Sequence, residues 1–506
     1  MRGLTRVFPY LFLFMGSFLL LSCQSSTVDK TPGVPLEPLS PEIMKEDTDT
    51  FFQILEETHP DLYYRWSEEG YRTEKQALYE NVRVPATRLQ FQRMLAQFAG
   101  RIHDGHTKVR CEGGGSTQAL PFTVTWIENQ VVVDEVKEAG KHAGLEKGDR
   151  IIRFAGKPIN EYLDTLLTYS SYEVYECARL RALRYALPFS TGYQVVTGEV
   201  TLPATMELLI KKADGREIAV TLAYAPPEKT GQGQNPAYRP EFESRMLESG
   251  KAAYLKWTGF NDKRTKEFEF KLFGTSPAKD QAYPPSFNDF LRGLFETMQT
   301  SGTSHLIIDV RENGGGNSSL SYTLTRYLTD RNIIEYPGFV KNSPLLNKQV
   351  AGLDLPGLKT YPLGARIPDK DIWGEGKEEE IRAFFAPVPL PRDLFRGKVI
   401  ILTGYRTYSA AEQFCCLMRD NGLAILLGEP TGNGASGPID VIPFELPRTK
   451  TKGGVSFAFR LRPDKNERLI KPDIPCSQTY RDFLADRDTV LERALQLVRE
   501  EGEKKP

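Results

Sequence analysis

The sequence predicts a multidomain α/β protein, and three observations lead to this expectation. The chain has 506 residues, which is too long for one domain and suggests roughly two to four. Apolar residues recur at helical spacing through residues 43–100, whereas short strand-like runs follow from about residue 118. Residues 306–310, 399–402 and 424–427 are near-continuous apolar runs, as expected for buried parallel strands. The chain should therefore combine a helical start, a β-rich middle and a C-terminal α/β part.

The N-terminus is typical of an exported protein. Two arginines precede an apolar run over residues 7–21, which is too short to span a bilayer but suits the core of a signal peptide. The run ends at Ser22, and Cys23 follows, in a pattern that resembles a bacterial lipobox. This resemblance implies a signal peptide at residues 1–22 and acyl chains on Cys23 that anchor the protein to a membrane of the cell envelope, on its exported side. The alternative is an ordinary signal peptide followed by an incidental cysteine.

Composition excludes several classes of protein. The formal net charge is −1 and no long basic stretch occurs, so nucleic-acid binding is not expected. The five histidines form no HExxH motif, and the six cysteines form no CxxC pair. We therefore expect no bound metal and no other cofactor.

The chain divides into four parts after the signal segment. Residues 23–42 are rich in Pro, Ser and Thr and predict a flexible tether. Residues 43–115 predict a helical domain that ends in a turn entering a strand. Residues 116–227 predict a small β domain, and a polar stretch at residues 225–240 marks a linker. Residues 228–500 then form the α/β core.

The β domain contains the segment AGLEKGDRII at residues 143–152, in which glycine turns end a short helix and lead into an apolar strand. With this segment, the domain resembles a PDZ domain. PDZ domains bind a peptide as an added strand and hold its terminal carboxylate with backbone N–H groups. The resemblance implies that Leu120-Pro121-Phe122 forms the carboxylate end of that groove. A helical stretch over residues 163–187 is expected to be an insertion. The alternative is a small β domain that packs but binds nothing.

Two segments of the core carry groups suited to acyl transfer. Residues 309–317 follow a buried strand and contain three consecutive glycines. Glycines let backbone N–H groups approach a ligand, so the N–H of about Gly315 is a candidate donor to an oxyanion. Ser409 lies where a strand gives way to a helix, beside the N–H of Ala410. The alternative for Ser409 is a helix cap in a capping box with Glu412.

Five separated motifs occur along the chain in a fixed order. They are Asp104-Gly105-His106-Thr107, the PDZ segment, Asp309-x-Arg311-x-Asn313-Gly314-Gly315-Gly316, Thr407-x-Ser409-Ala410-Ala411-Glu412 and Gly428-Glu429-Pro430-Thr431-Gly432. In this order and spacing they resemble the tail-specific (C-terminal processing) serine peptidase family, over roughly residues 43–498. The resemblance implies a crotonase-like core, which is a spiral of β-β-α units, with Ser409 as the nucleophile.

The family has two branches that differ in the base. One branch uses a lysine about 25 residues after the serine, but no lysine occurs between Ser409 and Lys450. The other branch, similar to the core of the tricorn peptidase, uses a histidine that corresponds to His106. Imidazole suits this role because its pKa lies near neutral pH. His103 is a competitor three residues away. The remaining histidines, His59, His142 and His305, are expected to be surface or packing residues.

The group that orients His106 is harder to assign. The tricorn-like branch places a serine directly before the histidine, but this chain has Gly105 there. The branch also uses a distal glutamate, and Glu467, shortly before a Pro-Asp pair, fits that position. Asp104 is a local alternative. A carboxylate in this role would fix the imidazole tautomer and stabilise the imidazolium as it forms.

The sequence therefore predicts an exported, lipid-anchored serine endopeptidase that acts on protein or peptide substrates. Its PDZ domain would recognise protein segments or C-termini. The alternative is a catalytically inactive peptide- or ligand-binding lipoprotein on the same fold. An esterase of the α/β-hydrolase class is disfavoured because the chain has no GxSxG motif.

Overall fold

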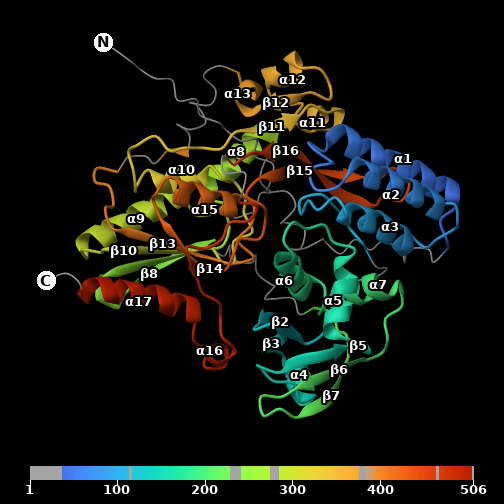
Figure 1. Ribbon diagram of the computed structural model, residues 1–506, viewed down its shortest axis with the longest axis horizontal. Helices are drawn as coiled ribbons and strands as arrows, with labels where there is room; N and C mark the ends of the chain where they lie inside the picture. Colours follow the sequence, from blue (N-terminus) through green and yellow to red (C-terminus); the bar gives the residue numbers. More distant parts are fainter. Residues whose placement is uncertain are drawn as a thin grey trace.

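The computed structural model shows a mixed α/β protein built from several domains (Figure 1). The expected fold class is thereby confirmed. The signal segment and Cys23 lie outside the described residues. Within the described residues, no helix is both long and apolar enough to cross a bilayer. The described residues are 37–112, 117–227, 241–273, 284–374, 385–386, 389, 391–462 and 467–503.

Three helices with a shared aromatic core open the described chain. Each begins after a serine or threonine whose hydroxyl accepts a backbone N–H of the first turn. Ser40 plays this part for the first helix, and Pro41 suits its first position because proline lacks an N–H. The last two residues assigned to the tether are therefore helical. The helices are α1 (Pro41–Thr58), α2 (Glu68–Asn81) and α3 (Arg88–Gly100).

The PDZ-like domain is an antiparallel sheet with four helices. Its strands lie in the order β2 (Phe122–Ile127), β3 (Gln130–Val136), β4 (Arg150–Phe154), β6 (Met206–Lys211) and β7 (Glu217–Leu222), and β5 (Lys157–Pro158) pairs with β4. The helices are α4 (Glu138–His142), α5 (Ile159–Leu167), α6 (Tyr175–Tyr185) and α7 (Ser190–Thr197). The helical insertion expected over residues 163–187 is present as α5 and α6, with a non-helical break at residues 168–174. Two serines and two tyrosines fill this break, and serine competes with helix formation through local hydrogen bonds.

The outer edge of strand β2 is covered by the chain itself. Strand β2 ends the sheet, and helix α6 packs against both β2 and α5 (Figure 1). The Arg179 guanidinium lies 3.5 Å from the centre of the Trp126 ring. At the expected carboxylate loop, the Leu120 N–H donates to the Pro188 carbonyl at 2.7 Å and the Phe122 N–H donates to the Leu120 carbonyl at 2.9 Å. Pro121 has no N–H, so this loop offers no free donor to a peptide carboxylate in this conformation.

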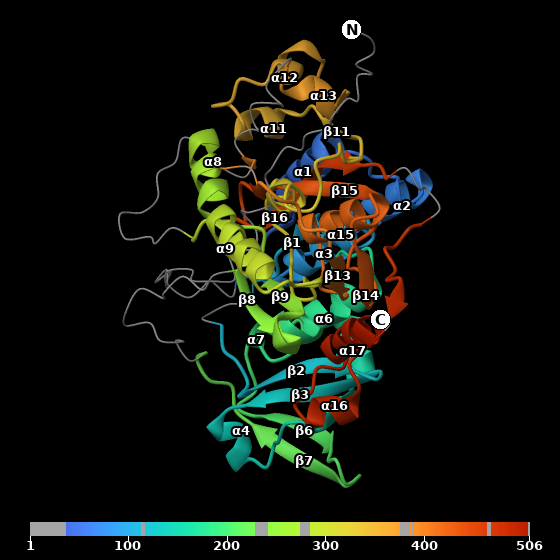
Figure 2. The ribbon, with the colours of Figure 1, turned by 90° about the vertical axis from the view of Figure 1, so that its left-hand side faces the viewer.

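The core is a mainly parallel sheet with helices on both faces. Strand β8 is the antiparallel edge strand, and the expected strands at residues 306–310, 399–402 and 424–427 are present as β10, β13 and β14. Because side chains alternate along a strand, one face packs on α9 and α15 and the other on α17 (Figure 2). The strands are, in order across the sheet, β17 (Ile474–Pro475), β14 (Ile425–Gly428), β13 (Lys398–Thr403), β10 (His305–Asp309), β9 (Ala252–Trp257) and β8 (Phe242–Leu247). The helices are α9 (Phe287–Thr300), α15 (Ala410–Asp420) and α17 (Thr489–Glu503).

A second core sheet carries the histidine motif. Strand β1 (Lys108–Val109), directly after the motif, pairs antiparallel with β16 (Lys452–Arg460), so Lys108 lies opposite Gly454. The Ser456 N–H also donates to Thr107 Oγ1 at 3.0 Å. These bonds hold a turn of the N-terminal domain against the core. The other strands of this sheet are β15 (Gly437–Glu445), β11 (Gly338–Lys341) and β12 (Arg366–Pro368).

Shorter helices complete the described core. One of them, α16, reaches the PDZ-like domain (Figure 2), where the Tyr480 hydroxyl donates to the Gly148 carbonyl at 2.7 Å. These helices are α8 (Lys263–Phe273), α10 (Leu320–Thr325), α11 (Pro344–Gln349), α12 (Pro356–Thr360), α13 (Asp369–Ile372) and α16 (Tyr480–Leu484).

Candidate active site

Ser409 lies between strand β13 and helix α15 with its side chain free of the helix. Its backbone has φ 56° and ψ −124°, and its hydroxyl makes no capping bond to α15. The alternative reading of Ser409 as a helix cap is therefore wrong. The Ser409 N–H instead donates to Asn433 Oδ1 at 2.7 Å. This bond, with the unusual backbone, turns the hydroxyl away from the helix and toward a half-buried space.

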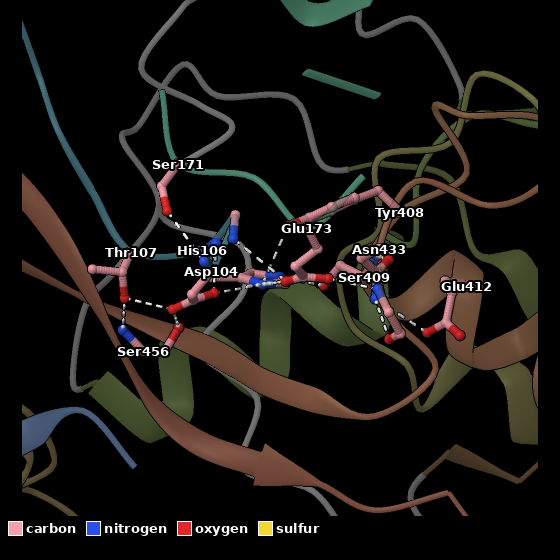
Figure 3. Close-up of polar contacts among 12 residues, drawn as sticks. Asp104, His106, Thr107, Ser171, Glu173, Tyr408, Ser409, Glu412, Asn433 and Ser456 are labelled. Carbon is pink, nitrogen blue, oxygen red and sulfur yellow. Dashed lines mark hydrogen bonds and ion pairs between the residues drawn. The ribbon is translucent and has the colours of Figure 1, made fainter. Parts of the chain in front are cut away.

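The structure brings His106 to Ser409 from the opposite end of the chain. His106 Nε2 lies 3.3 Å from Ser409 Oγ, although the two residues are 303 positions apart (Figure 3). The competitor His103 has an exposed side chain and makes an edge contact with the Tyr172 ring. Of the two histidines in the motif, His106 is thus the one that contacts the serine.

His106 is suited to accept a proton at neutral pH. Burial lowers its pKa to about 4, and the negative charge of Asp104 opposes that shift. The ring is therefore neutral at pH 7, and Nε2 has a free lone pair when the proton sits on Nδ1. A neutral imidazole is the form that a general base needs.

Asp104 builds the turn on which His106 sits. Its Oδ1 accepts the His106 N–H at 2.9 Å, while its Oδ2 accepts the hydroxyls of Thr107 at 2.5 Å and Ser456 at 2.6 Å. His59 Nε2 lies 3.2 Å from the same oxygen. Although burial raises the pKa of Asp104, these hydrogen bonds and the nearby imidazoles lower it well below its usual range. Asp104 is thus a permanent anion, and its Oδ1 lies 3.8 Å from His106 Nδ1.

Two groups beside Nδ1 were missed by the sequence analysis. The Tyr408 hydroxyl lies 3.4 Å from His106 Nδ1, and Glu173 Oε1 lies 4.0 Å from the same nitrogen. A Cβ at Gly105 would collide with that tyrosine hydroxyl, so the phenol fills the place where a longer residue before the histidine would project. Tyr408 precedes the expected nucleophile, but no sequence signal placed Glu173 near it.

The glycine loop approaches Ser409 closely. Gly315 has φ +102°, and a Cβ there would lie 2.8 Å from Ser409 Cβ and 3.0 Å from the Ala410 nitrogen. Only glycine fits this conformation and this space. The Gly315 N–H, however, donates to Asn313 Oδ1 at 2.9 Å. The expectation that this N–H holds the oxyanion is therefore corrected. Gly315 lacks a side chain that would collide with Ser409, and its N–H already donates to Asn313.

Ala410 retains its expected position. Among the described residues no acceptor is recorded for its N–H, as expected at the first position of a helix. The N–H therefore remains free to donate to an oxyanion beside Ser409.

Glu467 does not lie at His106. Its Oε2 accepts from Arg419 Nη2 at 2.7 Å and from Arg462 Nη1 at 2.5 Å. Burial raises its pKa, but the hydrogen bonds from these two guanidinium groups outweigh burial and lower it. The structure therefore assigns Glu467 to an ion-pair cluster and not to the orientation of the imidazole.

The described residues contain one group of three potential metal ligands within 4.8 Å of one another, and it consists of Asp104, His106 and Glu173. Both oxygens of Asp104 already accept hydrogen bonds from the protein. His106 directs its Nε2 to Ser409. The donor set therefore fits a hydrogen-bonded acid–base cluster better than a metal centre.

The comparisons with known proteins define the class. Residues 251–445 match the model of peptidase family S41, and residues 116–241 match a PDZ domain model. The chain is therefore a serine-type peptidase that carries a PDZ domain and a segment similar to peptidase family S41. The S41 segment contains Ser409 and the glycine loop, whereas His106 lies outside both segments. No curated protein matches the chain.

Solved structures show the same fold at low sequence identity. Mature CPAF in complex with lactacystin is 17% identical, with a TM-score of 0.60, over 91% of this chain and 100% of that chain. A serine-to-alanine mutant of CPAF is 16% identical, with a TM-score of 0.61, over 90% of this chain and 98% of that chain. The arrangement of helical, PDZ and core domains therefore occurs as a unit in another protein.

Proposed function

We propose that this protein is an exported, lipid-anchored serine endopeptidase in which Ser409 is the nucleophile and His106 the general base. One observation carries the assignment: His106 Nε2 lies 3.3 Å from Ser409 Oγ. A serine hydroxyl is weakly nucleophilic without such a base. The neutral state of His106, which follows from its lowered pKa, leaves Nε2 ready to take the proton.

The reaction follows from these positions. Ser409 Oγ attacks the substrate carbonyl carbon while Nε2 of His106 takes the hydroxyl proton. The tetrahedral intermediate collapses, and the imidazolium returns the proton to the leaving amine. Water, deprotonated by the same imidazole, then attacks the acyl-enzyme and restores the Ser409 hydroxyl.

We assign the oxyanion to the N–H groups of Ala410 and Gly316. The Gly315 carbonyl accepts the Phe260 N–H, and the Asn317 N–H donates to the Phe260 carbonyl. Because C=O and N–H point in opposite directions across one peptide plane, the Gly316 N–H points away from Phe260. No acceptor for it is recorded among the described residues. Removal of one oxyanion donor lowers the rate by about 10²–10³.

A fluorophosphonate probe tests the nucleophile. Wild type and Ser409→Ala are incubated with the probe, and Ser301→Ala, an exposed serine of the same domain, serves as the control. We expect label on wild type and on the control, mapped to Ser409 by peptide mass spectrometry, and none on Ser409→Ala. Equal labelling of wild type and Ser409→Ala would refute the assignment. Absence of label on all three would favour the inactive binding protein on the same fold.

Protein or peptide substrates follow from the peptidase and PDZ domains, but capture of a free C-terminus needs a rearrangement. The N–H groups of Leu120 and Phe122 already have backbone acceptors, and α6 packs on β2. A peptide that adds to β2 would have to displace α6.

Proteomics of released peptides, with wild type and Ser409→Ala compared, identifies the substrates. Unchanged termini would argue against proteolysis.

The membrane anchor is a separate part of the proposal. It rests on the lipobox-like segment that ends at Cys23. Metabolic labelling with radioactive palmitate should mark the wild type in its native host and the Cys476→Ser control, but not Cys23→Ser. Labelling that survives in Cys23→Ser would refute lipidation at this residue.

A further inference from the structure

His106 needs an acceptor at Nδ1 during the reaction. When Nε2 takes the proton of Ser409, both ring nitrogens carry a proton, and Nδ1–H must point to an oxygen. Three oxygens lie near Nδ1. They are Tyr408 Oη at 3.4 Å, Asp104 Oδ1 at 3.8 Å and Glu173 Oε1 at 4.0 Å.

Asp104, the nearer carboxylate, already has four hydrogen-bonding partners. A carboxylate offers about four acceptor positions. The Asp104 oxygens accept the His106 N–H and the hydroxyls of Thr107 and Ser456, and His59 Nε2 contacts Oδ2 at 3.2 Å. Three of these four contacts are to Oδ2, and Oδ1 accepts the backbone N–H of His106 itself, so Asp104 serves mainly to hold the turn in place.

Glu173 accepts fewer hydrogen bonds than Asp104. Its Oε2 accepts the Gly434 N–H at 2.5 Å, and its Oε1 accepts only a long bond from the Gly105 N–H at 3.4 Å. The side chain is 2% exposed, so little water competes for the free lone pairs. Figure 3 shows Glu173 between the His106 ring and Asn433. Oε1 is thus a buried acceptor beside Nδ1.

Tyr408 is a weaker candidate for this role. Its phenol can accept a hydrogen bond, but burial raises its pKa far above the usual value, so the group stays neutral. The Arg181 guanidinium lies 3.8 Å from the centre of its ring. A neutral phenol beside a cation does not balance the positive charge of an imidazolium.

We infer that Glu173, supplied by the PDZ domain, is the positioning carboxylate of the catalytic centre: its Oε1 receives Nδ1–H as His106 takes the proton from Ser409. This inference rests on the proposed function. The only atom that passes between residues is the proton that moves from Ser409 Oγ to His106 Nε2. Glu173 contributes its negative charge and a lone pair to Nδ1–H.

Glu173 lies in the break between α5 and α6, and contacts on both sides of this break fix its position. Its neighbour Val174 packs with Cys177 and Tyr408, and the Ser171 hydroxyl accepts the Asp104 N–H at 3.2 Å. Helix α6 is fixed in turn on β2. The carboxylate is therefore in place only when the PDZ domain is docked on both the histidine turn and the core.

The charge of Glu173 changes near neutral pH. Burial raises its pKa to about 7, and the Asp104 anion adds to the rise, whereas Arg65 and the N–H groups of Gly434 and Gly105 oppose it. The other titratable or charged neighbours are His106, Arg181, Cys177 and Tyr408. Below about pH 7 the Glu173 carboxyl is neutral and does not balance the positive charge of the His106 imidazolium. We therefore expect kcat to rise with pH as Glu173 loses its proton.

The experiment compares pH profiles of kcat and KM for wild type, Glu173→Gln and the exposed control Glu161→Gln. Glutamine keeps the size of the side chain and an oxygen for the Gly434 N–H. At pH 8 we expect Glu173→Gln to lower kcat by about 10–100-fold with KM changed less than about twofold. The rise through neutrality should disappear, and Glu161→Gln should match wild type.

Two results would overturn the inference. One is a Glu173→Gln profile that coincides with wild type, and the other is an equal loss at every pH. If Glu173→Gln fails to fold, as judged by circular dichroism, Glu173→Asp replaces it: a shorter carboxylate should keep the rise with pH at a lower kcat, and loss of that rise would refute the role. Fluorophosphonate labelling of the same samples separates the two claims. Unlabelled wild type refutes the nucleophile, whereas labelled wild type with an indifferent Glu173→Gln refutes Glu173 alone.

Discussion

The proposed site has a nucleophile half around Ser409 and a base half around His106, and the two are built in different ways. Around Ser409 the supports come from the core domain: Asn433 accepts the Ser409 N–H, and the Tyr408 N–H donates to the Asn313 carbonyl at 2.9 Å. Around His106 the supports come from three domains, because Asp104, Glu173 and Ser456 belong to the helical, PDZ and core parts. The nucleophile half is therefore a local structure, whereas the base half exists only when the domains are docked.

The largest expected effect lies in the base half. His106→Ala should lower kcat by about 10⁴-fold or more, because Ser409 loses its proton acceptor. His103→Ala, three residues away with an exposed side chain, should change kcat by less than about threefold. Steady-state peptide hydrolysis measures both. A larger loss in His103→Ala than in His106→Ala would reverse the assignment of the base.

The next effect tests the nucleophile half. Gly315→Ala should lower kcat by about 10²–10³-fold, because its Cβ would lie 2.8 Å from Ser409 Cβ and 3.0 Å from the Ala410 nitrogen. Gly302→Ala is the matched control, since Gly302 also has positive φ but its Cβ would meet nothing within 4 Å. Gly315→Ala should also lose more stability in urea unfolding than Gly302→Ala, because only its Cβ collides with neighbouring atoms, and only Gly315→Ala should lose activity. Full activity in Gly315→Ala would show that the loop does not border the oxyanion.

A smaller effect separates Glu467 from the base half. Glu467→Gln should leave kcat within about threefold of wild type but lower the free energy of unfolding by roughly 1–2 kcal/mol, because it weakens the contacts with Arg462 and Arg419. Urea unfolding measures the stability. Glu445→Gln, whose partner Lys450 lies 3.8 Å away on the surface, should change it by less than about 0.5 kcal/mol. A large loss of kcat in Glu467→Gln would restore this glutamate as a candidate to orient the imidazole.

The smallest effect concerns Glu412, which supports the nucleophile half. Burial raises its pKa to about 7, against bonds from Cys416 and Asn433 that lower it. The folded state therefore holds a proton that the unfolded state releases above about pH 4.5, so stability falls as pH rises toward and through 7. Through this group the free energy of unfolding should fall by roughly 1 kcal/mol between pH 6 and 8. Glu412→Gln should lack this fall relative to wild type in urea unfolding at the two pH values. An equal pH dependence in both proteins would contradict the buried, titrating carboxyl.

The same contrast explains what the sequence could predict. The strands at residues 306–310 and 399–402, the turn into α15 and the Thr-x-Ser-Ala-Ala-Glu segment are patterns of adjacent residues, and their local structure follows from periodicity and helix termini. Ser409 could be named for this reason. The hydrogen bond that occupies the Gly315 N–H could not be foreseen, because it depends on the Asn313 rotamer.

The base half depends on tertiary contacts that leave no local pattern. Glu173 lies in a break that reads as continuous helix, and its partner Gly434 is 261 residues away. His59 is expected to be a surface or packing residue, and the structure buries it against Asp104, a contact that no local pattern indicates. The spacing of Glu467 from a Pro-Asp pair predicts a place beside His106, but it carries no information about the contacts with Arg419 and Arg462. Spacing along the chain is thus a poor guide where several domains meet.

The backbone of Ser409 has a consequence for the evolution of stability. With φ 56° and ψ −124°, a residue that carries a Cβ is strained by about 1–3 kcal/mol. Glycine would adopt this conformation without that strain, so the fold would gain stability if glycine replaced the proposed nucleophile. The serine at this position therefore has a cost in folding stability that glycine would not have.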